Sequence, residues 1–296
     1  MTFVLKPYLE ARRVSIEEAL DRFLPGADDR PARLHQSLRY SVLAPGKRLR
    51  PTLVLAGAEA VGGTAADVMP TACALECIHA FSLIHDDLPC MDNDDYRRGR
   101  LTNHKVYGEA LALLAGDALL ALAFQLICDN AATAPPERIL PTLRMVAEAS
   151  GTWGMVGGQV VDMESQGKEV TPDTLRYIHE HKTGALLTAS VLSGAMLAGA
   201  APDQMDALRR YGGHIGLAFQ IADDILDVTG DQALLGKPVG SDEERDKATY
   251  PRLYGLEESR RRAAAEVDSA VHALDLFGTP AEPLRAIARY IIERDL

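Results

Sequence analysis

Apolar residues recur along most of the chain at the intervals of three and four that are typical of amphipathic helices. The pattern is clear in six segments: 67–85, 108–131, 171–200, 203–230, 255–278 and 281–295. The first is rich in apolar residues, and the second is apolar nearly all round, which is typical of a helix buried inside a large bundle. We find no alternating strand segment and no hairpin turn between β-branched runs. The sequence therefore predicts an all-α fold.

Helix ends and connections support the same interpretation. Thr171 can cap a helix whose first position is Pro172, and Gly230 can stop the segment that precedes it. The proline and glycine breaks are too short for interdomain linkers and lie near 45–46, 62–63, 135–136, 151–158 and 278–283. With 296 residues, of which 47% are hydrophobic, the chain can bury a large core. We expect a single domain over residues 1–296.

Charge and cysteine content narrow the functional class. The formal net charge of −11 argues against a nucleic-acid partner bound by a broad basic surface. Four cysteines without a CxxC pair favour a reducing environment, so we expect a cytoplasmic location. No uninterrupted apolar run reaches the roughly 18 residues of a membrane span, and the N-terminus lacks a cleavable signal pattern. We therefore expect no membrane span.

One acidic cluster follows the segment 67–85. It reads DDLPCMDNDD and places Asp86, Asp87 and Asp92 close together. On an unbroken helix Asp86 and Asp92 would point about 120° apart. Pro89 lies between them, and proline disrupts a helix interior. We expect a local break that returns Asp92 to the side of Asp86.

A second acidic cluster, DDILD, lies near the end of segment 203–230. Asp223 and Asp227 are four residues apart and so project from one helix face, with Gln220 one turn earlier. Asp224 is turned away by about 100°. Oxygen ligands in this arrangement suit Mg²⁺, which binds through one or two carboxylates together with water and substrate phosphate.

Cations accompany both clusters. Arg97 and Arg98 follow the first, and Lys237 follows the second. Lys47 and Arg50 precede a proline at a helix start. A solvated acidic face is the simpler explanation for one such cluster, but both clusters end apolar segments, where an unneutralised charge costs free energy. Acids beside these cations predict a metal and a polyanion together, because arginine binds phosphate oxygens in a bidentate manner.

These motifs resemble those of the trans-polyprenyl diphosphate synthases. DDLPCMD and DDILD are similar to the two aspartate-rich motifs of that family, and GKRLRP, GGQVVDM, HKTGAL and KATYP occur in the family's order, from about residue 35 onwards. The resemblance implies an isoprenoid-synthase helical bundle around a deep central cavity. It also implies a prenyltransferase that joins isopentenyl diphosphate to an allylic diphosphate, and a homodimer with one site per subunit.

The resemblance also assigns roles to individual residues. Three Mg²⁺ ions per site, with Mn²⁺ as the alternative metal, would be held by Asp86, Asp92, Asp223 and Asp227, with Asp87 and Asp224 beside them. The allylic diphosphate would be bound by Arg97, Lys182, Thr183, Gln220 and Lys237. The diphosphate of isopentenyl diphosphate would be bound by Lys47, Arg50, His79 and Arg98. Gln159 and Asp162 would line the same cavity.

Product length is a finer question. In this family the floor of the cavity lies four and five residues before the first motif, here at Ser82 and Phe81. The bulky Phe81, together with the two-residue insertion of Pro89 and Cys90, resembles bacterial farnesyl diphosphate synthases. We therefore expect condensation of isopentenyl diphosphate with dimethylallyl or geranyl diphosphate to farnesyl diphosphate.

Three alternatives are open. The first is a geranylgeranyl diphosphate synthase, because the wider motif also occurs in those enzymes. The second is a non-catalytic regulatory subunit, which should have lost acids from one cluster, whereas this chain keeps both. The third is a terpene cyclase, which needs only one diphosphate site, whereas GKRLR, His79 and Arg98 supply a second.

Overall fold

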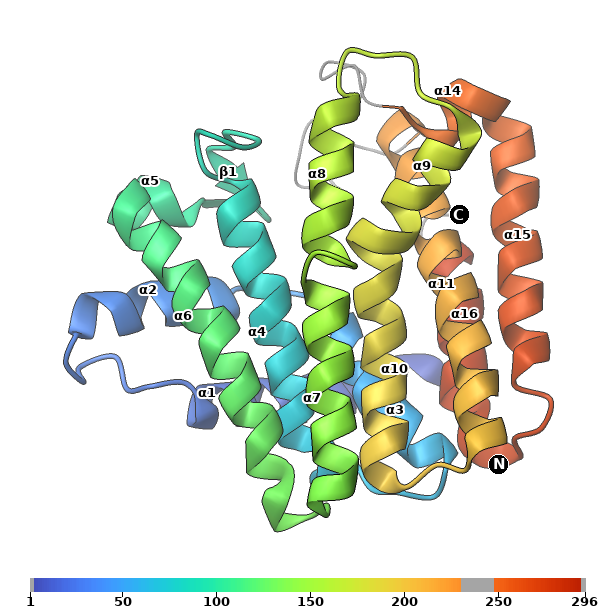
Figure 1. Cartoon of the computed structure of the whole chain (residues 1–296), viewed down its shortest axis with the longest axis horizontal. Helices are drawn as coiled ribbons and strands as arrows, with labels where there is room; N and C mark the ends of the chain where they lie inside the picture. Colours follow the sequence, from blue (N-terminus) through green and yellow to red (C-terminus); the bar gives the residue numbers. More distant parts are fainter. Residues whose placement is uncertain (1–2, 230–247, 294–296) are drawn as a thin grey trace.

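The computed structural model describes residues 3–229 and 248–293, and helices dominate it (Figure 1). The first helices are α1 (Leu5–Phe23), α2 (Ala32–Val42), α3 (Leu49–Ala60), α4 (Met69–Asp86), α5 (Asn103–Tyr107) and α6 (Glu109–Cys128). The later helices are α7 (Pro136–Ser150), α8 (Met155–Ser165), α9 (Pro172–Ile178), α10 (Ala185–Ala198), α11 (Pro202–Thr229), α14 (Tyr250–Tyr254), α15 (Leu256–Ala273) and α16 (Glu282–Glu293). The predicted all-α bundle is confirmed.

Helices α4 and α10 form the centre of the bundle. Helix α4 packs mainly on α6 and α3, while α10 packs on α3, α11 and α7. Helices α3 and α10 approach closely because each places a glycine against the backbone of the other. A Cβ on Gly57 would lie 2.2 Å from the carbonyl oxygen of Val191, and a Cβ on Gly194 would lie 1.9 Å from that of Val54. Larger residues would therefore push these central helices apart.

This packing brings the ends of α4 and α11 towards the same end of the bundle. Figure 1 shows both helices finishing towards that end, while α10 begins below α9. The two acidic motifs stand at the ends of α4 and α11. The fold therefore gathers segments that are far apart in the sequence.

The helix predicted over 171–200 is interrupted. It begins as expected, because Thr171 Oγ1 accepts a hydrogen bond from the N–H of Thr174 at 3.2 Å and Pro172 is the first helical residue. A π turn, His179–Gly184, then separates α9 from α10. Such turns are rare and often occur at functional sites. The sequence pattern could not reveal it.

A short hairpin, which the sequence did not predict, follows the first acidic cluster. Strand β1 (Tyr96–Arg97) pairs antiparallel with β2 (Arg100–Leu101). The turn residues Arg98 and Gly99 have positive φ angles of 53° and 73°, as tight two-residue hairpin turns often require. With two residues in each strand, no alternating pattern exists for a sequence to display.

Two segments of the described chain are long and apolar enough for a membrane span by length and composition alone, Ala66–Asp86 and Glu109–Ala132. The apolar window of the first is 67% buried inside the protein and that of the second is 39% buried. The core helices of soluble bundles meet the same criteria, and both segments contribute to the main core. The expectation of no span rested on unbroken apolar runs, a stricter criterion that neither segment meets.

Candidate active site

The first acidic cluster forms where α4 ends. The chain leaves the helix at Asp86, and the N–H of Asp92 donates to the carbonyl oxygen of Asp86 at 2.8 Å. Asn93 follows with a φ of 53°, and its N–H donates to the carbonyl oxygen of Leu88 at 3.1 Å. The chain therefore turns back around Pro89. The predicted break, which returns Asp92 to Asp86, is confirmed for the backbone.

Asp87 and Arg97 form a multiply bonded ion pair beside this turn. Nε of Arg97 donates to both carboxylate oxygens of Asp87, at 2.8 and 3.0 Å, and Nη2 lies 2.6 Å from Oδ1. Burial raises the pKa of Asp87, and the guanidinium of Arg97 opposes that rise. Asp87 therefore holds Arg97 in place at the edge of the acidic cluster.

The π turn supplies a second set of polar groups. Lys182 Nζ lies 2.6 Å from Oδ2 of Asp162 on α8, and Thr183 Oγ1 donates to Oε1 of Gln220 at 2.8 Å. Burial lowers the pKa of Lys182, but the charges of Asp162 and Asp86 raise it above its ordinary value. Burial raises the pKa of Asp86, and Lys182 opposes that rise. Because each charge affects the other, the π turn and the first cluster face the same space.

Two glycines let the π turn fit between α8 and α11. A Cβ on Gly158 of α8 would lie 2.2 Å from the backbone nitrogen of Lys182. A Cβ on Gly216 of α11 would lie 2.6 Å from Cα of Gly184. Both contacts involve backbone atoms, which cannot rotate away. The glycines therefore set how closely Lys182 and Thr183 approach the site, and Gly158 belongs to the GGQVVDM motif that the sequence displays.

The second acidic cluster lies on α11 next to the π turn. Asp224 and Asp227 are buried, at 3% and 4% exposure. Burial lowers the pKa of Arg50 to about 10, and the charge of Asp223 is among those that oppose the shift. Asp223 therefore lies near Arg50 on α3. Asp86 likewise lies near Lys182 of the π turn. That the two clusters share one metal-binding space stays a prediction.

The basic residues gather beside the first cluster. Burial lowers the pKa of His79 well below its ordinary value, and the charges of Arg50 and Arg98 lower it further, so His79 is neutral at pH 7. A cavity of about 50 Å³ is lined in part by His79, Arg97 and Arg98. Lys47 is exposed. Lys237 lies outside the described residues.

Arg48, which was not among the predicted site residues, anchors this basic group. Its Nη1 donates to Oε1 of Glu76 at 2.6 Å, and its Nη2 donates to the carbonyl oxygen of Ala44 at 2.7 Å. The side chains of Arg48 and Glu76 are 1% and 5% exposed. A buried charge requires a partner. Glu76 inside the apolar segment 67–85 was therefore the sequence signal that a buried cation such as Arg48 lies against this helix.

The expected chain-length positions lie on α4. Phe81 is 8% exposed and meets the ring of His85 edge to face, with centroids 4.8 Å apart at 78°. His85 Nε2 lies 3.0 Å from the carbonyl oxygen of Leu113 on α6, against Gly116, where a Cβ would come within 2.1 Å of the ring. Ser82 is half-buried and bonds to the backbone of its own helix. Phe81 thus packs on His85, and His85 in turn contacts α6.

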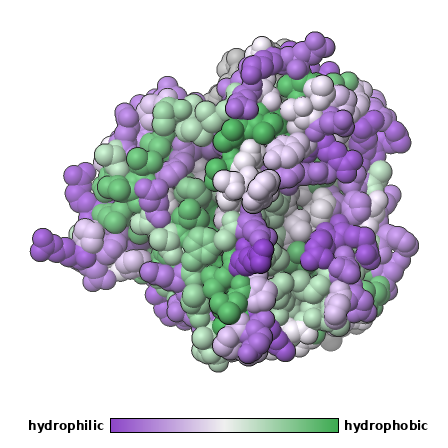
Figure 2. Space-filling view, viewed as in Figure 1, coloured by the Kyte–Doolittle hydropathy of each residue, from purple (hydrophilic) through white to green (hydrophobic). Residues whose placement is uncertain are grey.

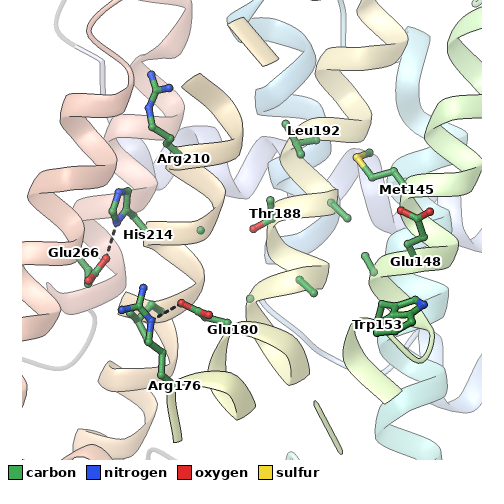
Figure 3. Close-up of a pocket in the computed structure, with 16 residues that line it drawn as sticks. Met145, Glu148, Trp153, Arg176, Glu180, Thr188, Leu192, Arg210, His214 and Glu266 are labelled. Carbon is green, nitrogen blue, oxygen red and sulfur yellow. Dashed lines mark hydrogen bonds and ion pairs between the residues drawn. The ribbon is translucent and has the colours of Figure 1, made fainter. Parts of the chain in front are cut away.

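A larger cavity, of about 580 Å³, opens on another side of the π turn (Figure 3). Arg176 pairs with Glu180 at 2.7 Å and His214 pairs with Glu266 at 2.6 Å on its lining. Trp153 stands at its edge in the same view. None of the predicted site residues lines this cavity. A choice of active site by cavity volume alone would therefore miss the acidic clusters.

The acidic residues fit a hard divalent cation. No group of three or more His, Cys, Asp or Glu side chains is close enough to hold a metal within residues 3–229 and 248–293. The two clusters nevertheless offer carboxylate oxygens, the donors that Mg²⁺ prefers. Burial, followed by repulsion from Asp92 and Asp87, raises the pKa of Asp86, and a cation beside these carboxylates would relieve that repulsion. The donor set therefore suits Mg²⁺.

Comparisons with known proteins agree with this geometry. The polyprenyl synthetase family model matches residues 31–275. The geranylgeranyl diphosphate synthase of Cyanophora paradoxa is 50% identical over 99% of this chain and 97% of its own. The farnesyl diphosphate synthase of Geobacillus stearothermophilus is 45% identical over 98% of each.

Solved structures give the same result. The FPP/GFPP synthase of Zymomonas mobilis superposes with a TM-score of 0.86 at 41% identity, covering 96% of this chain and 99% of that one. The geranylgeranyl pyrophosphate synthetase of Pyrococcus horikoshii superposes with a TM-score of 0.88 at 31% identity, covering 98% of each chain. The chain therefore belongs to the polyprenyl synthetase family and is a prenyltransferase of the trans-prenyl diphosphate synthase type.

Proposed function

We propose that this protein condenses isopentenyl diphosphate with dimethylallyl and then geranyl diphosphate, and releases farnesyl diphosphate as its main product. The observation that carries the chain length is Phe81, a buried aromatic ring braced by His85 against α6. A ring in this position shortens the space that a growing prenyl chain can occupy below Asp86. Addition of a fourth isoprene unit would require the ring to move.

The polar groups divide into two diphosphate sites. Arg97, fixed by Asp87, and the residues around the π turn bind the allylic diphosphate, namely Lys182, Thr183 and Gln220. Arg50, His79 and Arg98 bind the diphosphate of isopentenyl diphosphate, with neutral His79 acting as a hydrogen-bond donor. Lys47 and Lys237 complete the two sites. Because the two basic groups lie on different helices, the two diphosphates bind at separate but neighbouring positions.

Metal ions would be held by Asp86, Asp92, Asp223 and Asp227, and when bound they neutralise the allylic diphosphate so that it can leave. The protein's own groups then determine the reaction. The allylic C–O bond breaks, the double bond of isopentenyl diphosphate attacks the resulting carbocation, and the departing diphosphate takes the proton that is lost. Fixed placement of both diphosphates brings the reacting carbons together, and the apolar helices exclude water that would quench the cation.

Geranylgeranyl diphosphate is the second candidate product. It is favoured by the relative from Cyanophora paradoxa, a geranylgeranyl diphosphate synthase that is 50% identical to this chain. The two products differ by one isoprene unit, so the same diphosphate sites serve both. Only the depth of the space below Asp86 separates them.

One assay tests the proposal. The protein is incubated with isopentenyl and dimethylallyl diphosphates and Mg²⁺, and the products are separated by chromatography. A fifteen-carbon product supports the proposal, and a twenty-carbon product favours the second candidate. A cyclic hydrocarbon, or no product, would refute chain elongation in favour of a cyclase or a regulatory subunit.

Phe81→Ala tests the floor directly. We expect the main product to lengthen to twenty carbons or more, because the substitution removes the ring that limits the space. Loss of a buried Phe costs about 3–5 kcal/mol of stability, so thermal unfolding must confirm that the variant is folded at the assay temperature. Phe81→Leu keeps most of the packing and should give a smaller shift. A folded Phe81→Ala variant with an unchanged product would reject this position as the floor.

We also propose that two copies of the chain form a homodimer through α6 and α8. Support comes from exposed apolar side chains on these helices: Leu113 and Leu114 on α6, and Val156, Val160 and Met163 on α8, each more than 40% exposed. Green areas over these helices contrast with the largely purple surface near α15 in Figure 2. Light scattering should give twice the chain mass, and Leu114→Glu should give the monomer. A monomeric unmodified protein would contradict the proposal.

A further inference from the structure

A buried network joins the π turn to α11 and α14. His179, the first residue of the π turn, is 4% exposed, and its ring stacks on that of Tyr250 with centroids 5.3 Å apart at 17°. Its Nε2 lies 3.5 Å from Oδ2 of Asp224. Because the three residues belong to three elements, their contacts tie those elements together.

Asp224 is occupied by this network. Its Oδ2 accepts the backbone N–H of Tyr250 at 2.9 Å, and its Oδ1 accepts a hydrogen bond from Nε2 of Gln220 at 3.3 Å. The residue is only 3% exposed. Both oxygens are therefore engaged within the protein, whereas the neighbouring Asp223 lies near Arg50. The two adjacent aspartates of one motif have different surroundings.

The ring of His179 is neutral, with its proton on Nε2. Burial lowers the pKa of His179 to about 3, so the ring carries no charge at pH 7. Its Nδ1 is buried and has no hydrogen-bond partner within the described ranges, while Nε2 faces a carboxylate. A protonated Nε2 beside Asp224 agrees with both observations, because the other tautomer would bury an unpaired N–H and set a lone pair against the carboxylate.

This network fixes one end of the π turn and glycine packing fixes the other. His179 begins the turn, and Gly184 ends it against Gly216. Lys182 and Thr183 project from the part between these two points. A displacement of the His179 end would therefore rotate both side chains relative to the acidic clusters.

We propose that His179 is a positioning residue for the condensation site. By bridging Asp224 and Tyr250 it holds the π turn so that Lys182 and Thr183 remain aimed at the allylic diphosphate. Asp224 then serves to hold the protein's own elements and is not a ligand of Mg²⁺. The inference rests on the proposed function only in taking Lys182 and Thr183 as diphosphate-binding residues.

The first test compares variants at two histidines of the same turn. His179→Phe keeps the ring stack but removes the N–H, and we expect kcat for isopentenyl transfer to fall about 10- to 100-fold, as is typical for groups that orient a site. The KM for isopentenyl diphosphate should stay within about 3-fold, because Arg50 and His79 lie on other helices. His179→Gln can restore the donor and should recover most of kcat. His181→Phe is the control, since His181 stacks on Tyr177 instead, with centroids 3.8 Å apart.

The outcomes are decisive in both directions. A folded His179→Phe variant with unchanged kcat would overturn the proposal, and so would an equal loss in His179→Gln or in the control His181→Phe. Total isopentenyl transfer is counted whatever the product length, so an error in the proposed chain length leaves this test intact.

A second measurement does not depend on turnover or on the His179 variants folding. Binding of inorganic diphosphate in the presence of Mg²⁺ is measured by calorimetry for Asp224→Asn and Asp223→Asn. The amide oxygen introduced by Asp224→Asn can still accept the N–H of Tyr250, so we expect the affinity of this variant to stay within about 3-fold, while Asp223→Asn loses at least about 10-fold. Equal losses in the two variants would overturn the assignment of Asp224.

Discussion

Gly158→Ala offers a sharp test of how the π turn is positioned. A Cβ at this position would lie 2.2 Å from the backbone nitrogen of Lys182 and 2.7 Å from its Cα. Ordinary contacts of a Cβ begin near 3.4 Å, so α8 and the turn must separate by about 1.2 Å. Neither backbone can rotate away from the clash. Lys182 and Thr183 would therefore shift by up to about 1.2 Å relative to α8.

The expected kinetic effect follows from this displacement. A misplacement of about 1 Å can cost about 100-fold in rate, equivalent to about 2.7 kcal/mol. Steady-state kcat/KM for the allylic substrate should fall by this order. Overpacking should also reduce stability by about 1–3 kcal/mol, which is measured by urea unfolding.

Gly213→Ala is the matched control. Gly213 lies in α11, and no atom lies within 4 Å of an added Cβ. We expect unchanged kcat/KM and a gain of up to about 1 kcal/mol, because alanine favours a helix more than glycine does. A folded Gly158→Ala variant with kcat/KM close to that of the unmodified protein would refute the idea that this glycine sets the position of the turn.

Two further predictions concern stability. Glu76→Ala leaves the buried Arg48 without its main partner and should lower the free energy of unfolding in urea by about 3–5 kcal/mol. Glu148→Ala breaks the pair with Arg144, whose side chains are 55% and 82% exposed, and should cost less than about 1 kcal/mol. Equal losses in the two variants would contradict this account. Burial lowers the pKa of His179 to about 3 in the folded protein, whereas in the unfolded chain this histidine binds a proton below about pH 6.5. The contribution of neutral His179 to stability is therefore complete above about pH 6.5 and is lost as the pH falls towards 3. The unfolding free energy of the unmodified protein should therefore fall faster between pH 7 and pH 5 than that of His179→Gln, by up to about 1.4 kcal/mol per pH unit, and parallel curves would contradict the prediction.

Local chemistry made much of this protein predictable. The all-α fold follows from apolar periodicity, the start of α9 from Thr171 and Pro172, and the turn after Asp86 from Pro89, because each depends on neighbours within a few residues. The two aspartate motifs also predicted a candidate site, since their spacing on a helix sets which carboxylates share a face.

Long-range contacts account for the features that were not predicted. Asp224 is buried against Tyr250, and Arg48 is anchored by Glu76, so each contact joins segments that are distant in the sequence. The π turn likewise packs against glycines of α8 and α11. Apolar periodicity describes which face of a helix is buried, but it does not say which partner lies against that face. The sequence therefore specified the helices and the chemical groups. Backbone contacts such as that between Gly158 and Lys182 set the distances between those groups. Only the tertiary structure decides these distances, because close packing depends on atoms that the folded chain brings together.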